Sequence, residues 1–147
     1  MIKMKWLLIL FLIVLDLYLV FNTRDPDNLR DVKLLYKTLR EYIRDNHDTV
    51  PEKFWVLETP IVITGKETGD LGYNSNKGYE IGVCLGGSTN DVFHVLLHEL
   101  AHSTVEEYDH SEEFWKNFAE LRDLASRLGL YQKIPDRKEF CGQYIND

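Results

Sequence analysis

The chain opens with a nearly continuous apolar run. Residues 6–21 are apolar except for Asp16, and Lys3 and Lys5 stand before them. A run of this length is at the short limit for a helix that spans a bilayer, and no small-x-small cleavage site follows it. We therefore predict a retained signal anchor in residues 1–23. A cleaved signal peptide is the second interpretation, and a buried core helix, which Asp16 favours slightly, is the third.

After this run the pattern changes to amphipathic segments. Residues 25–44 repeat apolar side chains at helical spacing, and Pro26 lies where a first helical turn tolerates it. The apolar side of this predicted helix consists of Leu29, Val32, Leu35, Tyr36, Leu39, Tyr42 and Ile43. Short apolar runs at residues 55–57 and 61–64, separated by Pro60, then predict two strands.

A loop and a hairpin are predicted next. Residues 65–72 are rich in turn formers, and the runs at 71–73 and 79–85 flank a polar turn at 74–78. This arrangement is typical of two antiparallel strands. The second arm leads through two glycines into the next helical segment.

Two further helices close the predicted order of elements. Residues 91–104 contain neither Pro nor Gly, and residues 88–90 supply N-cap side chains. This helix has a broad apolar surface made of Val92, Phe93, Val95, Leu96 and Leu100. The next helix, over residues 114–128, begins after a cap at Asp109 or Ser111. Its buried stripe consists of Phe114, Trp115, Phe118, Leu121, Leu124, Ala125 and Leu128.

Length and charge narrow the class of protein. The chain has 147 residues, which suits one domain, and we assign residues 25–147 to an α+β domain with a small sheet. The formal net charge of −7 argues against nucleic acid as the main partner. The two cysteines, Cys84 and Cys141, cannot form a zinc knuckle by themselves. They would pair in an oxidising compartment, but we predict free thiols.

The candidate chemistry lies in the helix over residues 91–104. It contains His98-Glu99-Leu100-Ala101-His102, an H-E-x-x-H pattern. Two histidines four residues apart project from one helix face, so their imidazoles can converge on one Zn²⁺. Glu99 then lies beside the open coordination position and suits a general base. The alternative is a buried helix with two incidental histidines.

A catalytic zinc usually takes three protein ligands. The spacing favours His110 as the third, because a short loop over residues 103–109 can return it to the metal. Glu120, farther along the next helix, is the rival ligand. His94 is one turn before His98, but one straight helix cannot direct three successive turns at one tetrahedral ion, so we predict a packed residue. His47 lies in a polar segment and is interpreted as a surface residue.

These residues carry a resemblance to a known family. The segment from Leu96 to His102, followed by residues 109–115, resembles the WLM and SprT-like zinc metallopeptidases. It is most similar to the short WLM-like proteins of large DNA viruses, in which a Cys-Leu strand precedes the helix and a Cys-Gly segment lies near the C-terminus. The resemblance covers roughly residues 55–145 and departs from the family at Ser111, where Gly is common.

The resemblance implies a zincin-like fold, with His98, His102 and His110 as zinc ligands and Glu99 as the catalytic base. In zincins the strand before the active-site helix often forms the edge of the cleft, so residues 79–85 are our candidate for pairing with an extended substrate. An ordinary edge strand is the alternative.

We therefore predict a membrane-anchored metalloendopeptidase that hydrolyses peptide bonds by a zinc-bound water, with protein or peptide substrates. Residues 6–21 hold it to the membrane as a single-pass anchor, but basic residues on both sides of the run leave its orientation open. One alternative is a non-catalytic membrane protein that zinc stabilises. Another is a protease that acts on DNA-bound protein adducts. The substrate, the oligomeric state and the substrate-binding residues stay open.

Overall fold

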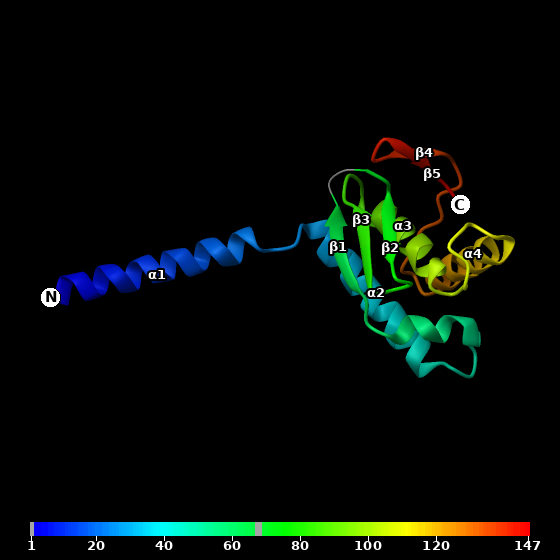
Figure 1. Ribbon diagram of the computed structural model, residues 1–147, viewed down its shortest axis with the longest axis horizontal. Coiled ribbons are helices and arrows are strands. Elements are labelled where there is room, and N and C mark those ends of the chain that lie inside the picture. The colour runs from blue at the N-terminus through cyan, green and yellow to red at the C-terminus, as the bar shows by residue number, and fades with distance from the viewer. Residues whose placement is uncertain (1, 67–68) are drawn as a thin grey trace.

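The computed structural model describes residues 2–66 and 69–147 of the chain. An isolated apolar helix, α1 (Ile2–Asn22), precedes a mixed α+β domain, and it extends away from that domain in Figure 1. None of the residues in α1 is buried. By length and composition α1 could cross a membrane or act as a signal sequence. It does not pack into the domain core, so the interpretation as a buried core helix is wrong.

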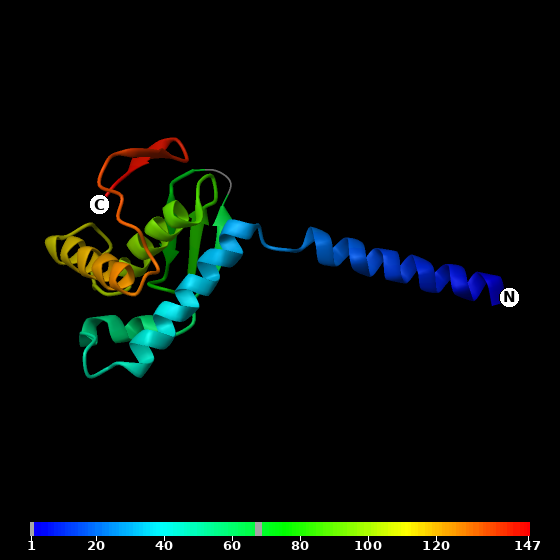
Figure 2. The same ribbon diagram turned by 180° about the vertical axis from the view of Figure 1, so that it is seen from behind.

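The domain begins with α2 (Asp27–Asp45), close to the predicted bounds. Its buried side chains are Leu29, Val32, Tyr36, Leu39 and Ile43, which recur at helical spacing and confirm the predicted apolar side. The helix contacts its neighbours α3 (Thr89–His102) and β1 (Val62–Lys66). Figure 2 shows α2 in front of the sheet, whereas it lies behind the sheet in Figure 1, so it covers one sheet face.

The predicted strand at residues 55–57 is wrong. This segment lies in a 3-10 helix, η1 (Glu52–Glu58), which starts directly after Pro51. Phe54 and Leu57 are its buried residues, and their spacing of three is the period of a 3-10 helix rather than the period of two of a strand. A short apolar run does not by itself distinguish these two structures.

The main sheet has three strands in the order β1-β3-β2. The predicted hairpin is confirmed: β2 (Gly72–Ser75) pairs antiparallel with β3 (Glu80–Cys84), with Tyr73 opposite Gly82. β1 pairs parallel with β3 on its other side, and Ile63 lies opposite Ile81. The expectation that residues 79–85 form the edge of the cleft is therefore wrong, because β3 is the central strand and β2 is an edge. The loop predicted for residues 65–72 includes residues 67 and 68, which lie outside the described residues.

The two helices that carry the candidate chemistry pack against each other on the same side of the sheet. α3 contacts α2, β2 and β3, and α4 (Glu112–Arg127) contacts α3. Ser88 caps α3: its hydroxyl accepts from the Asp91 backbone N–H at 3.2 Å, and the Asp91 carboxylate accepts from the Ser88 N–H. Ser111, one of the two predicted caps, starts α4 in the same manner by accepting from Phe114 N–H.

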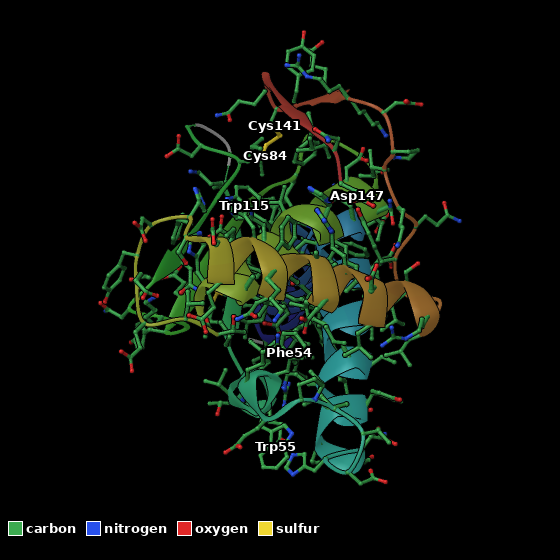
Figure 3. All side chains as sticks on the ribbon, turned by 90° about the vertical axis from the view of Figure 1, so that its right-hand side faces the viewer. Phe54, Trp55, Cys84, Trp115, Cys141 and Asp147 are labelled. Carbon is green, nitrogen blue, oxygen red and sulfur yellow. A yellow bond between two sulfur atoms is a disulfide. The ribbon has the colours of Figure 1, made fainter. Side chains whose placement is uncertain are left out.

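The C-terminal segment returns to the start of α3 as a small hairpin of β4 (Lys138–Phe140) and β5 (Gln143–Ile145). The free thiols predicted for Cys84 and Cys141 are wrong, because the two residues form a disulfide (Figure 3). The end of β3 and the turn of the C-terminal hairpin bring their Cα atoms within 6.6 Å, a separation suited to a disulfide. The sequence does not reveal this proximity, because 57 residues separate the two cysteines along the chain.

Candidate metal centre

Three histidines come together at the C-terminal half of α3. His98 and His102 lie one turn apart on this helix, and His110 approaches them from the loop before α4. One ring nitrogen from each lies within 4.8 Å of the other two. The Nε2 atoms of His98 and His110 are 3.0 Å apart. Among the described residues this is the group of histidines, cysteines and carboxylates close enough to hold a single ion.

Lys77 fixes the loop that returns His110 to the helix. Its ammonium donates to the backbone carbonyl of His102 at 3.2 Å, to that of Val105 at 2.7 Å, and to that of Glu107. The loop is also tied to α4, since the Asn117 amide donates to the Thr104 hydroxyl at 3.0 Å. In the sequence, Lys77 is only part of the polar turn predicted for residues 74–78. Its role depends on contacts with residues 25 to 30 positions later in the chain. No local sequence pattern reveals such contacts.

Aromatic side chains surround the three imidazoles. Phe114 stacks on His102 with 4.4 Å between ring centroids, and Trp115 lies 5.3 Å from the His110 ring. Burial in these surroundings lowers the pKa of His98 to about 3 and that of His102 to about 4, and the neighbouring histidines add to the effect. Both imidazoles are therefore neutral at pH 7, which is the form that binds a metal.

Glu99 is buried next to the histidines and lines the same cleft. Burial raises the pKa of its carboxyl to about 7; the Lys66 charge opposes this shift and the Asp70 charge adds to it. Gly72 of the edge strand β2 lies directly against this carboxylate: a Cβ atom at Gly72 would stand 3.0 Å from Glu99 Oε1. The Asn74 amide, also on β2, donates to the backbone carbonyl of Glu99 at 2.7 Å.

The cleft around these residues has a volume of about 490 Å³. Residues 70–72, at the start of the edge strand, line one part of it, and residues 143–146 of the C-terminal hairpin line another. Trp115 and Phe118 of α4 complete the wall beside the histidines. The cleft is thus built from the middle of the domain sequence and from its C-terminal segment.

Neither Glu120 nor His94 belongs to the group of three histidines. Glu120 pairs with Lys53 at 2.5 Å and lines a different cleft, so it does not join the histidines. His94 is buried, as expected of a packed residue, and its Nδ1 lies 2.8 Å from the Tyr131 hydroxyl. Burial lowers the pKa of His94 to about 4. His47 lies at the surface, where it stacks on Trp55.

Comparison with known proteins places the chain in a family. The WLM domain pattern matches residues 52–143, which is most of the folded domain and includes the three histidines, Glu99 and both cysteines. The chain belongs to the WLM family. The matched region holds the cleft-lining residues from Asp70 to Gln143, and Tyr144, Ile145 and Asn146 lie just beyond it.

Curated relatives of this WLM chain occur in large DNA viruses. One is uncharacterized protein R325 of Acanthamoeba polyphaga mimivirus, 38% identical over 85 residues that cover 51% of this chain and 43% of the relative. Another is uncharacterized protein 136R of Invertebrate iridescent virus 6, 34% identical over 94 residues that cover 62% and 46%. The chain thus spans less than half the length of these relatives. No solved structure matches it.

Proposed function

We propose that this WLM protein is a zinc-dependent metalloendopeptidase with a zincin-like domain. The observation that carries the proposal is the group of His98, His102 and His110, with ring nitrogens within 4.8 Å, in one cleft with the buried carboxyl of Glu99. Three histidine imidazoles are a common ligand set for catalytic zinc, which keeps a further position open. The residues present therefore fit this metal.

Each residue has a distinct role in the proposed reaction. The three histidines hold the ion, which when bound would supply Lewis-acid activation of water and of the peptide carbonyl. Glu99 accepts a proton from the attacking water and passes it to the leaving amine. Its raised pKa, about 7, places it near the pH at which a group can both take up and release a proton.

A purely structural metal site would not require the Glu99 carboxylate. Raising a carboxyl pKa from 4.5 to about 7 costs the folded, metal-free chain about 3 kcal/mol when that carboxyl is ionised. A site that only stabilised the fold would be better served by an uncharged side chain at this position. The buried Glu99 therefore favours catalysis over the non-catalytic alternative.

The edge strand β2 offers a place for an extended peptide. One side of β2 pairs with β3, and its other side is an edge of the sheet next to the cleft. Gly72 on this strand lines the cleft beside Glu99. A substrate that added to β2 by backbone hydrogen bonds would pass its peptide bonds across the metal centre. We assign this role to β2 in place of residues 79–85.

We further propose that α1 anchors the domain to a membrane. Four residues separate the end of α1 from the start of α2, so the two helix ends are at most about 18 Å apart. The cleft would then act on substrates close to the membrane surface. The disulfide favours a domain exposed on an oxidising side, because disulfides persist in such compartments.

The activity is tested with the full chain in detergent, loaded with zinc, on a mixture of unfolded proteins. We expect Glu99→Gln to lower the rate of cleavage at least about a hundredfold while zinc content stays at one per chain. Glu120→Gln, a carboxylate change outside the cleft, is the matched control and should cleave normally. Undiminished cleavage by Glu99→Gln would contradict the assigned base, and no cleavage by the zinc-loaded natural chain would contradict the proposed activity.

A further inference from the structure

Trp115 has an unusual position for a large apolar side chain. It is 50% exposed, yet its ring lies 5.3 Å from that of His110 and 6.0 Å from that of His98. Figure 3 shows it on the upper side of α4, below the C-terminal hairpin that carries Cys141. Any molecule bound at the three histidines would therefore lie next to the Trp115 indole.

A second aromatic side chain lines the cleft from a different segment. Tyr144 of β5 is 59% exposed, with the Arg137 guanidinium 4.3 Å from its ring centroid, and the adjacent Ile145 is buried against the core. Both line the cleft together with Trp115 and Phe118. Half-exposed aromatic rings gain most when a partner covers them, because they bring a large apolar area out of water at a small cost in side-chain entropy.

The hairpin wall is firmly attached to the domain. The disulfide holds Cys141 to the end of β3, and Lys138 pairs with the buried carboxylate of Asp91 at 2.8 Å. Beyond β5, the Asp147 backbone N–H donates to the Ile134 carbonyl at 2.8 Å. Tyr144 and Ile145 lie between these attachments, so this wall is a fixed part of the cleft.

The charge of the cleft agrees with an apolar occupant. Its acidic lining residues are Asp70 and Glu99, and neither Lys nor Arg lines it within residues 2–66 and 69–147. Apart from the metal that the three histidines would hold, a carboxylate on a bound ligand would find no positively charged side chain in this lining. An uncharged apolar group needs no such partner and covers the exposed rings.

We propose that Trp115, together with the other cleft-lining residues Phe118, Tyr144 and Ile145, forms a subsite for a large apolar side chain. The substrate class is then a protein or peptide with a bulky aliphatic or aromatic residue beside the scissile bond. This proposal rests on the proposed metallopeptidase function, since it places that residue by its distance from the metal ligands.

The test measures binding rather than cleavage. Calorimetry on the zinc-loaded full chain in detergent compares two metal-directed probes, acetohydroxamate and phenylacetohydroxamate. They share the metal-binding group, and the second adds a phenyl ring. We expect phenylacetohydroxamate to bind at least about tenfold more tightly, as an apolar pocket distinguishes ligands by their apolar size. Equal affinities would overturn the proposal.

Single-residue variants test which side chains give phenylacetohydroxamate its higher affinity. Trp115→Ala should remove most of the ratio between the two probes, and Tyr144→Ala, from the opposite wall, should lower it independently. Tyr79→Ala is the matched control, because Tyr79 is 74% exposed and does not line the cleft. A ratio that survives in both Trp115→Ala and Tyr144→Ala would overturn the subsite.

The two proposals can fail separately. If the probes rank as expected but the natural chain cleaves no peptide, the metallopeptidase function fails and the apolar subsite stands. If peptides are cleaved but phenylacetohydroxamate has no advantage, the subsite fails and the activity stands.

Discussion

Glu99 and the histidines beside it show opposite effects of the same burial. Removal from water raises the pKa of the Glu99 carboxyl to about 7 and lowers that of His98 to about 3. Both shifts favour the uncharged form of the group. The uncharged form of a histidine is the form that binds a metal. For Glu99, in contrast, ionisation destabilises the folded, metal-free chain.

This conflict predicts a pH-dependent effect of Glu99→Gln on stability. The folded pKa of Glu99 is above its ordinary value of 4.5, so its contribution is complete below pH 4.5 and is lost as the pH rises towards 7. Glutamine does not titrate. Relative to the natural chain, metal-free Glu99→Gln should therefore become more stable by about 3 kcal/mol between pH 4.5 and pH 8.

Urea unfolding of both chains in the presence of a chelator measures this difference. Glu120→Gln, the same change at a carboxylate outside the cleft, is the control. A difference between Glu99→Gln and the natural chain that is the same at both pH values would show that Glu99 is not buried as described.

The sequence reveals the metal-binding residues better than the residues that hold them. His98, Glu99 and His102 lie within one helical turn, and that spacing alone places them together. His110 is predicted from its loop, and the structure brings it to the other two histidines. Lys77 and Asn74 position the loop and the helix through contacts at least 25 residues away in the chain. Such pairings follow from the tertiary fold and have no local signature.

At the scale of elements, the close approach of β2 to α3 determines the cleft. A Cβ atom at Gly72 would stand 2.8 Å from Val95 Cγ1 and 3.0 Å from both Glu99 Oε1 and the Gly82 carbonyl oxygen. The strand can therefore lie this near to the helix only without a side chain at Gly72.

Gly72→Ala should separate β2 from α3. We expect it to lower the free energy of unfolding by about 1–3 kcal/mol, as other overpacked sites do, and to reduce peptide cleavage by displacing the Glu99 carboxylate. Urea unfolding and the cleavage assay measure the two effects. Ser75→Ala, at the other end of the same strand, is the control. A Gly72→Ala variant as stable as the natural chain would contradict the close packing of β2 against α3.

Local patterns predict most elements but not the order of the strands. The hairpin of β2 and β3 follows from its turn residues, and both caps follow from Ser88 and Ser111. The central place of β3 depends on its parallel pairing with β1, which is separated from it in the chain by the whole of β2. Neighbouring segments give no information on that pairing.

At the scale of the whole molecule, the disulfide closes the domain. It joins the end of the central strand to the C-terminal hairpin, 57 residues away, and so holds one wall of the cleft. In the chain-entropy model a cross-link over a loop of this length stabilises a protein by about 4 kcal/mol.

The Cys84→Ser, Cys141→Ser double variant should therefore unfold at a lower urea concentration than the natural chain. Addition of a thiol reductant should lower the stability of the natural chain to that of the variant and leave the variant unchanged. Thiol titration of the denatured natural chain, prepared without reductant, checks the bond itself. Two free thiols per chain would contradict it.

The proposed function requires His98, His102 and His110 to hold one zinc. Its most direct test is the zinc content of the full chain in detergent, compared with His110→Ala and Glu120→Ala. We expect one zinc per chain in the natural protein and in Glu120→Ala, and a loss or sharp weakening of zinc binding in His110→Ala. Equal zinc binding by His110→Ala and the natural chain, or no zinc in any of the three, would contradict it.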